Sequence, residues 1–300
     1  MVTGSPFENG RNTEIIDLEY PTFNCTKVPK FPIQLYFATG GLVNDTPIVC
    51  GGYKVTSNSK SKDCYKLNGA WHLDRLAKLS TVRSNAALGS AIWNNHLLVV
   101  GGYSSRYLHT MELVTPNARS KTLRMRLPLG LGLSCIVPWD SNTFMVIGGY
   151  STKSSKSKET YFIDMINNRV TPGPSLINGR RYLGCQEMIV NGESFIVVAG
   201  GSGAKNLTEF LPKSNLKGGW EKGPDLPVSV SHHQLVASTD KTCLYTIGNT
   251  GSNGKDIYKL SCAGVISDCL WTKADVQLKY GRFSPVAMYV PEALVSKLCQ

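Results

Sequence analysis

The chain has 300 residues, of which 42% are hydrophobic and 18% are charged, so it carries enough apolar side chains for a substantial core. It contains no run of about 18 apolar residues, which excludes a membrane-spanning helix. The net charge of +11 comes from scattered Lys and Arg residues that are not interleaved with aromatic residues, so a nucleic-acid-binding module is not expected.

An apolar segment that ends in a glycine pair recurs along the chain. The copies are PIVCGGY (47–53), LLVVGGY (97–103), FMVIGGY (144–150), FIVVAGG (195–201) and a weaker fifth, LYTIGNT (244–250). The period is close to 50 residues, which indicates a repeat architecture. Glycine permits the sharp turn and close approach that the chain requires after a buried strand. The expected turn glycines are Gly51, Gly52, Gly101, Gly102, Gly148, Gly149, Gly200, Gly201 and Gly248.

Each repeat also has the same internal order. An apolar first segment, such as residues 85–93, precedes the segment that ends in glycine, and a polar loop, a third strand and a fourth segment follow. The fourth segment often carries a tryptophan (Trp71, Trp220 and Trp271), whose large ring can be buried against the neighbouring repeat. Four short strands per repeat are typical of one blade of a β-propeller.

Five complete blades are expected in chain order, and both ends of the chain contribute to a sixth. The five are residues 31–76, 83–126, 131–173, 181–224 and 231–275. The sixth combines 282–299 with 1–29, and such closure leaves no free edge strand. The predicted fold is therefore an all-β, six-bladed propeller closed by strands from both termini, in a single domain of residues 1–300.

The strands of the sixth blade can be assigned in two ways. In the first, 284–290 is the first strand, 292–299 a candidate second, 13–19 the third and 24–29 the fourth. In the second, MVTG at the start of the chain is the end of the second strand, because VTG resembles the VVGG of other blades. In that case an upstream strand start, and with it any signal peptide, would lie outside this sequence.

The turn that leads into a blade ends in arginine in three places: LSTVR (79–83), PSLINGR (174–180) and QLKYGR (277–282). Together with the glycine pairs and the tryptophans, these residues resemble the Kelch family, over nearly the whole chain. The third and fifth blades depart from the pattern, with LPLGLGL and LPVSVSHH and no arginine. The resemblance implies a Kelch-type β-propeller.

Most of the nine cysteines can be related through the blade pattern. Cys50 and Cys64 lie on the second and third strands of one blade, which are antiparallel neighbours at a separation compatible with a disulfide. Cys135 and Cys185 lie on first strands near the axis and are expected to be buried thiols, and Cys243 is expected to be unpaired. The three expected disulfides are Cys50–Cys64, Cys262–Cys269 and Cys25–Cys299.

Two or three disulfides favour an oxidising compartment, and a cytoplasmic location is the alternative. Three N-glycosylation sequons, at Asn24, Asn44 and Asn206, agree with a secreted glycoprotein, although no signal peptide is visible. The sequence around Cys50, Cys64 and Trp71 resembles the first blade of secreted Kelch-like proteins of invertebrates.

No catalytic, cofactor or metal site is predicted. Adjacent residues of a strand point to opposite faces, so His232 and His233 cannot both face one metal ion. Cys135 or Cys185 with Tyr182 supplies only fragments of a copper-radical oxidase site. The best catalytic cluster is Glu187 with Arg180 or Arg181 near the axis. Apolar first-strand residues predict a filled axial channel rather than a pocket: Ala86, Ala87, Leu88, Ile136, Val137, Ile189 and Val190.

The expected function is non-catalytic binding of a protein or glycan through loops on one propeller face, by a monomer. Two Ser/Lys loops, 53–62 and 150–158, should flank the second blade and form a basic rim for an acidic ligand. The residues of this rim are Lys54, Lys60, Lys62, Arg106, Lys153, Lys156 and Lys158. The alternative function is a Kelch-type propeller enzyme acting on a sugar, either epimerase-like or oxidase-like.

Overall fold

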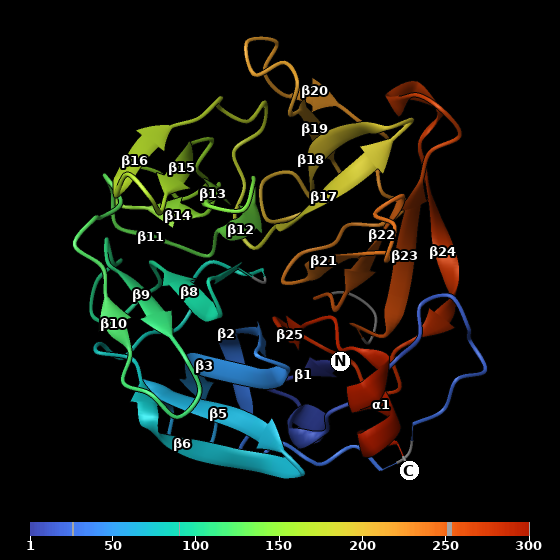
Figure 1. The fold of residues 1–300 in the computed structure, drawn as a ribbon. Helices are drawn as coiled ribbons and strands as arrows, with labels where there is room; N and C mark the ends of the chain where they lie inside the picture. Colours follow the sequence, from blue (N-terminus) through green and yellow to red (C-terminus); the bar gives the residue numbers. More distant parts are fainter. Residues whose placement is uncertain (26, 90, 251–253, 300) are drawn as a thin grey trace.

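The computed structural model describes residues 1–25, 27–89, 91–250 and 254–299, and its fold is an all-β propeller. Five antiparallel sheets, each with four main strands, are arranged around a central axis (Figure 1). Their strands are β2 (Leu35–Val43), β3 (Thr46–Lys54), β5 (Asp63–Asn68) and β6 (Ala70–Lys78) in blade one; β7 (Ile92–Trp93), β8 (His96–Val100), β9 (Met111–Val114) and β10 (Lys121–Thr122) in blade two; β12 (Cys135–Pro138), β13 (Thr143–Ile147), β15 (Thr160–Asp164) and β16 (Arg169–Pro172) in blade three; β17 (Gly184–Val190), β18 (Glu193–Ala199), β19 (Thr208–Pro212) and β20 (Glu221–Lys222) in blade four; and β21 (Gln234–Ala237), β22 (Cys243–Ile247), β23 (Asp256–Ser261) and β24 (Leu270–Gln277) in blade five.

Short elements complete the described chain. β4 (Ser59–Lys60) pairs with β3, and β11 (Leu131–Gly132) pairs with β14 (Tyr150–Ser151). The helical elements are η1 (Glu8–Arg11), η3 (Ile266–Asp268) and α1 (Glu292–Leu298). Among the described residues, no helix is long and apolar enough to cross a membrane.

The prediction of a six-bladed propeller is wrong, because the sector built from both ends of the chain holds only a two-stranded ladder. β1 (Val2–Thr3) pairs with β25 (Val286–Ala287), and Val2 also forms a bridge to Glu14. The segment 292–299, a candidate second strand, is mostly helix α1. Pro291 explains this change, because proline cannot donate to a ladder and its φ of −68° suits the start of a helix. The second assignment, with MVTG at the end of the second strand, agrees with the observed ladder.

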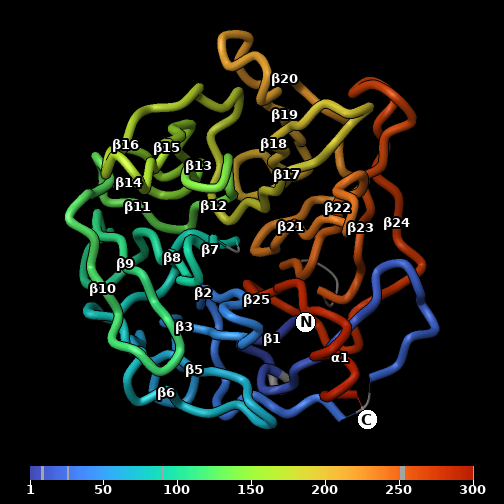
Figure 2. Tube along the Cα trace, viewed as in Figure 1, coloured from blue at the N-terminus to red at the C-terminus, as the bar shows by residue number. Residues whose placement is uncertain are grey.

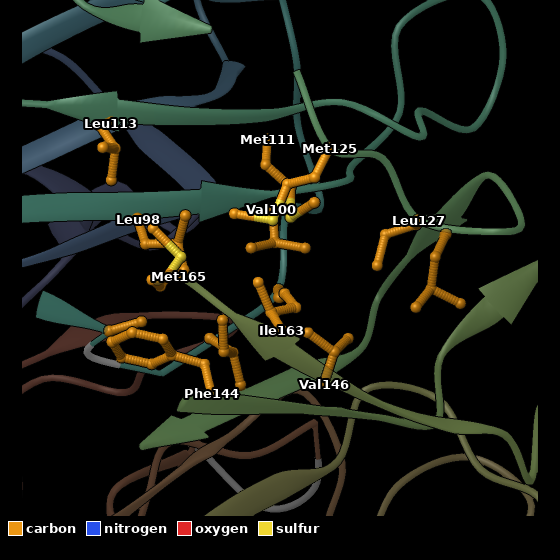
Figure 3. Close-up of a cluster of buried hydrophobic side chains, with 14 residues drawn as sticks. Leu98, Val100, Met111, Leu113, Met125, Leu127, Phe144, Val146, Ile163 and Met165 are labelled. Carbon is orange, nitrogen blue, oxygen red and sulfur yellow. The ribbon is translucent and has the colours of Figure 1, made fainter. Parts of the chain in front are cut away.

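Large side chains fill the spaces between neighbouring blades. Figure 3 shows the cluster between blades two and three, where Leu98 and Met111 of one sheet lie in a common core with Phe144 and Ile163 of the next. The blade tryptophans cross such interfaces: Trp71 donates a hydrogen bond to Thr13 (3.1 Å), Trp220 to the Pro174 carbonyl (2.9 Å) and Trp271 to Thr208 (3.0 Å). Blades one, four and five are therefore held to the preceding sector by both apolar burial and a specific hydrogen bond.

A ring of six equivalent residues surrounds the axis, one from each sector. Five backbone hydrogen bonds of 2.8–3.0 Å link them in chain order, each from the amide of a residue after Phe37 to the carbonyl of the member before it. Non-glycine residues with positive φ cost of order 1–3 kcal/mol, so the surrounding structure must hold them in place. The axial ring consists of Phe37 (φ 56°), Asn85 (56°), Leu133 (59°), Tyr182 (58°), His232 (59°) and Ser284 (47°).

Two positions alternate in chemistry from one sector to the next. Two residues before each member of the axial ring, the chain places in turn an apolar residue and an arginine, and all six are buried: Leu35, Arg83, Leu131, Arg180, Val230 and Arg282. The third strand alternates in step between tyrosine and glutamate, again all buried: Tyr65, Glu112, Tyr161, Glu209, Tyr258 and Glu14. Blades three and five lack arginine at this position because only every second sector carries one.

Each buried arginine is paired with the glutamate of its own sector. Arg83 bonds Glu112 and the carbonyls of Gly101 (2.9 Å) and Thr110 (3.2 Å). Arg282 bonds Glu14 at 2.7 Å, although the two residues stand 268 positions apart. The sixth sector is therefore closed by the same ion pair that the complete blades contain. The third pair is Arg180–Glu209.

The predicted turn glycines have positive φ in the structure, as the glycine-pair pattern requires: Gly51, Gly52, Gly101, Gly102, Gly148, Gly149, Gly200, Gly201 and Gly248. Gly101 shows why the close approach matters. A Cβ atom there would lie 2.2 Å from the carbonyl oxygen of Leu131 in the next blade. A side chain at this position is therefore excluded by sterics as well as by conformation.

Four disulfides are present, and three of them join the expected pairs: Cys25–Cys299, Cys50–Cys64 and Cys262–Cys269. The prediction that Cys135 and Cys185 are free thiols is wrong, because they form the fourth. They lie one repeat apart on the first strands of neighbouring blades, which converge near the axis to a Cα–Cα distance of 5.8 Å. Cys25–Cys299 joins the N-terminal segment to the end of α1, and both chain ends lie in the sixth sector (Figure 2). Cys243 is free.

Thiol counting tests this connectivity. Alkylation of the unfolded, unreduced protein should add one label, at Cys243, and alkylation after reduction should add nine. Peptide mapping should recover Cys135 and Cys185 in one disulfide-linked species. Recovery of both as alkylated thiols without reduction would contradict the axial crosslink.

The closing ion pair can be tested by Glu14→Gln, which keeps the side-chain shape but leaves the buried Arg282 charge unpaired. Loss of one partner of a buried pair costs about 3–5 kcal/mol, so urea denaturation should show a decrease of at least about 3 kcal/mol in the free energy of unfolding. Glu221→Gln, at an exposed glutamate, is the matched control. A decrease of less than about 0.5 kcal/mol for both variants would contradict a structural role for the pair.

Candidate functional site

Aromatic residues gather on the propeller face where the axial ring lies. Phe37 and Tyr182 belong to this ring, and Phe283 directly precedes one of its members. The Phe37 ring centroid lies 6.0 Å from that of Tyr182, 5.9 Å from that of His232 and 5.7 Å from that of Phe283. Residues from blades one, four and five and from the sixth sector therefore meet at one place.

The closest contacts are stacked. The His232 imidazole lies between Tyr182, with ring centroids 3.5 Å apart, and Phe283, at 4.3 Å. All three residues are half-buried, so each keeps part of its surface exposed. Stacked rings that remain partly exposed offer a preorganised surface for a ligand with an apolar face.

A second row of tyrosines continues the cluster through blades two and three. Tyr107 lies 5.0 Å from Tyr103 and stacks on Tyr150 at 4.5 Å. Lys60 of blade one lies 4.6 Å above the Tyr103 ring, and Arg181 of blade four lies 5.7 Å from the Tyr150 ring. These distances fall within the range of cation–π contacts.

The contacts form a closed circuit, which we call the aromatic face. Tyr36 completes it, because its ring contacts Tyr53 (5.5 Å) and Phe283 (6.2 Å), and Lys60 pairs with Tyr53 across β3 and β4. The members of the aromatic face are Tyr36, Phe37, Tyr53, Lys60, Tyr103, Tyr107, Tyr150, Arg181, Tyr182, His232 and Phe283.

Arg181 differs from its neighbour Arg180. The Arg180 guanidinium is fully buried and paired with Glu209, whereas that of Arg181 lies over Tyr150 and Tyr182 with no carboxylate partner among the described residues. Its Nε atom is buried without a hydrogen-bond partner in the described chain. A guanidinium in this state can bind a carboxylate or sulfate group.

The predicted basic rim is only partly available to a ligand. Lys54 forms an ion pair with Asp63 at 2.6 Å, and this bond raises the pKa of Lys54. Lys60 is half-buried over Tyr103. The loops 53–62 and 150–158 do flank blade two, through the contacts of Lys60 and Tyr150. The remaining members of the predicted rim are exposed: Lys62, Arg106, Lys153, Lys156 and Lys158.

The two histidines are held neutral. Burial, followed by electrostatic repulsion from the neighbouring His233 and Arg181 against a protonated ring, lowers the pKa of His232 to about 3. Burial and the Arg180 charge lower the pKa of His233 to about 3 as well. His233 is fully buried against Gly184 and Gly200, and neither ring nitrogen has a partner among the described residues. His233 is thus packed in the core, while His232 is stacked in the aromatic face.

Tyr107 and Tyr182 are phenols rather than phenolates at neutral pH. Burial, with the neighbouring Tyr150 and Tyr182, raises the pKa of Tyr107 to about 12. Burial also raises the pKa of Tyr182, against the opposing effect of Arg181. Their hydroxyl groups can therefore donate hydrogen bonds to a ligand.

The catalytic cluster considered from sequence does not assemble. Glu187 bonds Lys213 (2.7 Å), Lys241 (2.6 Å) and Ser194 (2.6 Å), which offset its burial and lower its pKa to about 2, whereas Arg180 bonds Glu209. Cys135 and Cys185 are joined in a disulfide. No group of three His, Cys, Asp or Glu residues in the described chain could hold a metal ion.

Most of the residues that the sequence assigned to the axial channel lie in the hydrophobic clusters between blades: Ala86, Ala87, Ile136, Val137 and Val190. Ala87 and Ile136 are buried, and Ile136 donates a backbone hydrogen bond to Leu88 of the neighbouring blade at 2.8 Å. Ile189 is half-buried. The other expected filling residues are also buried: Ala86, Val137 and Val190.

Sequence reasoning missed most of the aromatic face. The glycine-pair segments end in tyrosine in three blades, giving Tyr53, Tyr103 and Tyr150, and this was a usable signal. Phe37 and Phe283 have no such motif around them. They meet only in the closed ring, where Phe37 lies beside Tyr182 and Phe283 lies beside His232.

The comparisons with known proteins concern the fold. No family model and no curated protein matches the chain. Among solved structures, one described as "Structure of YjhT" is similar to this chain, with a TM-score of 0.65 over 88% of this chain and 90% of that chain. The sequence identity is 18%, so this likeness supports the β-propeller fold alone. The Kelch resemblance remains a prediction.

The depressed pKa of His233 predicts acid sensitivity. The unfolded state takes up a proton below pH 6.5 while the folded state stays neutral to about pH 3, so stability is complete above pH 6.5 and falls below it. Between pH 7.5 and 5.0 this histidine should contribute a loss of about 2 kcal/mol. Urea denaturation of His233→Leu should show a pH-dependent loss smaller by that amount. An equal loss in variant and wild type would contradict the assignment.

Proposed function

We propose that the protein is a binding module without chemistry of its own and that its aromatic face recognises an acidic glycan. The observation that carries the proposal is Arg181, a guanidinium with no acidic partner among the described residues, set between the rings of Tyr150 and Tyr182. The face thus combines flat apolar surfaces with a free cation, as a ligand that has a sugar ring and an anionic group requires.

Each part of the aromatic face suits one part of such a ligand. The C–H side of a pyranose ring is apolar and can lie against the exposed parts of Tyr182 and Phe283. A carboxylate or sulfate can accept two parallel hydrogen bonds from Arg181, and charge-assisted bonds of this kind are about twice as strong as neutral ones. Lys156 and Lys158 at the rim would add longer-range attraction, which salt screens.

A rigid scaffold favours this function. The axial ring fixes Phe37, Tyr182 and His232 through backbone hydrogen bonds, so a ligand does not have to order these side chains on binding. Preorganisation of this kind increases affinity because less conformational entropy is lost.

We also infer that the β1–β25 sector is a reduced sixth blade of a Kelch-type propeller. The six members of the axial ring support this, as does the Arg282–Glu14 pair in the alternating pattern. The four disulfides support an extracellular location. The sequon residues Asn24 and Asn44 are exposed and Asn206 is half-buried, which is compatible with glycosylation; Thr26 of the first sequon lies outside the described residues.

Heparin oligosaccharide, which carries carboxylates and sulfates, is a suitable probe for the aromatic face. Arg181→Ala should weaken binding about tenfold in isothermal titration, the equivalent of one lost charge-assisted contact. Arg75→Ala removes the same charge at an exposed position of β6 on the outer part of blade one and is the matched control. It should bind within twofold of wild type.

Two results would contradict the proposal. Equal weakening by Arg181→Ala and Arg75→Ala would indicate general attraction to a basic protein, not a site on the aromatic face. A change in the NMR spectrum of a sugar acid after incubation with the protein, absent with Arg181→Ala, would instead favour the alternative of a propeller enzyme acting on a sugar.

A further inference from the structure

The aromatic face has two cations, and they lie at opposite ends of a row of tyrosines. Lys60 of blade one lies 4.6 Å above the Tyr103 ring, and Arg181 of blade four lies 5.7 Å from the Tyr150 ring. Blades two and three lie between these two cations (Figure 1). They supply Tyr103, Tyr107 and Tyr150, which contact one another in this order and which we call the tyrosine row.

Neither cation is neutralised by a carboxylate in the part of the chain that the structure describes. Arg181 has a buried Nε atom without a hydrogen-bond partner there. Lys60 is half-buried, and the acid three residues further along the chain, Asp63, is already bonded to Lys54 at 2.6 Å. A cation that lies over an aromatic ring keeps its charge, so each end of the tyrosine row can bind an anionic group.

The blades hold the two cations at a fixed separation. Lys60 pairs with Tyr53 across β4 and β3, and Arg181 forms a bridge with Ser202 of its own blade. The tyrosine row is anchored in the same way, since its first two members form a bridge with each other and its third pairs with β11. A ligand therefore meets two charges whose backbone positions are set before binding, which reduces the entropy lost on binding.

The tyrosine row offers hydrogen bonds along the whole interval between the cations. Among the described residues, no group bonds the hydroxyls of its three members, whereas the Tyr53 hydroxyl is bonded to Asn58 at 2.6 Å. Burial raises the pKa of Tyr107 to about 12, so its hydroxyl is a donor at neutral pH. A ligand built of hydroxyl-bearing units can hydrogen-bond to the row while its two ends reach the cations.

We propose that the ligand of the aromatic face is a linear acidic oligosaccharide with anionic groups on at least two of its sugar residues. It lies along the tyrosine row with one anionic group on Arg181 and another on Lys60. This inference rests on the proposed function and specifies its ligand. A single sugar acid occupies only one end of the row, because two blades separate the cations. A longer ligand gains affinity because its second ionic contact is intramolecular.

Heparin oligosaccharides of two lengths, a disaccharide and a hexasaccharide, are the probes in isothermal titration. The hexasaccharide should bind at least about tenfold more tightly than the disaccharide, since only the longer probe reaches both cations. Lys60→Ala should weaken binding of the hexasaccharide about fivefold and leave that of the disaccharide within about twofold. Lys62→Ala, at an exposed lysine of the same loop, is the matched control and should change neither affinity by more than about twofold.

Tyr107→Phe tests the path of the ligand between the cations, because it removes one hydroxyl and keeps the stacked ring. It should weaken binding of the hexasaccharide about threefold, as expected for the loss of one neutral hydrogen bond. An unchanged affinity for the hexasaccharide would contradict a ligand that lies along the tyrosine row.

The proposal is overturned if Lys60→Ala leaves the affinity for the hexasaccharide unchanged or weakens binding of both probes equally, since Lys60 would then not be a second subsite. Arg181→Ala separates this result from a failure of the proposed function. If that variant still weakens binding of both probes, recognition of an acidic glycan stands and only the ligand with two anionic contacts is excluded. If it changes neither affinity, the proposed function fails as well.

Discussion

A buried arginine–glutamate pair, repeated in every second sector, is the interaction on which the propeller depends. The Arg83 carbonyl accepts a hydrogen bond from Gly52 of blade one, while its guanidinium bonds Glu112 of blade two. Arg180 and Arg282 join their sectors in the same way. Burial of an ion pair has a large desolvation cost, which is offset only when the remaining donors are satisfied. The Gly101 and Thr110 carbonyls satisfy donors of Arg83, so the pair fixes the angle between blades as well as their contact.

The alternating sectors achieve the same contact by apolar means. Where arginine is replaced by Leu131, the third strand carries Tyr161 in place of glutamate, so neither position leaves a charge unpaired. The backbone bond is kept, since Gly102 donates to the Leu131 carbonyl at 2.7 Å. The element that these joints share is therefore the backbone bond to this carbonyl, which is donated by the second glycine of the pair in blades one to four and by Asn249 in blade five. Because the sixth sector contains the Arg282–Glu14 version, it can close the ring without a complete blade, and Cys25–Cys299 strengthens the closure by about 5 kcal/mol in the chain-entropy model.

The sequence was sufficient for the propeller because its period comes from local steric requirements. Glycine is required where a Cβ atom would clash with a neighbouring carbonyl oxygen, as at Gly101, where the distance would be 2.2 Å. This requirement recurs in each blade, so glycine pairs appear in the sequence about every 50 residues. The sixth sector was less predictable, since Pro291 redirects a chain that otherwise continues as a strand. The Cys135–Cys185 bond depends on the convergence of the first strands of two neighbouring blades. The sequence pattern of a single blade does not reveal this convergence. The aromatic face was missed for a related reason: its members are 50 or more residues apart and meet only when the ring is closed.

The axial ring separates the part of the repeat that is fixed by folding from the part that is free to vary. Its six members share one backbone conformation and one hydrogen-bond pattern, yet they include Phe37, Asn85 and Ser284, whose side chains have nothing in common. Two residues earlier, by contrast, the side chain must be either apolar or an arginine with its glutamate. The buried contacts between sectors thus hold the strained backbone of the axial ring in place, and these contacts do not involve the side chains of the ring. Those side chains can change without loss of the fold, which makes this end of the axis the place where the repeat can acquire binding chemistry.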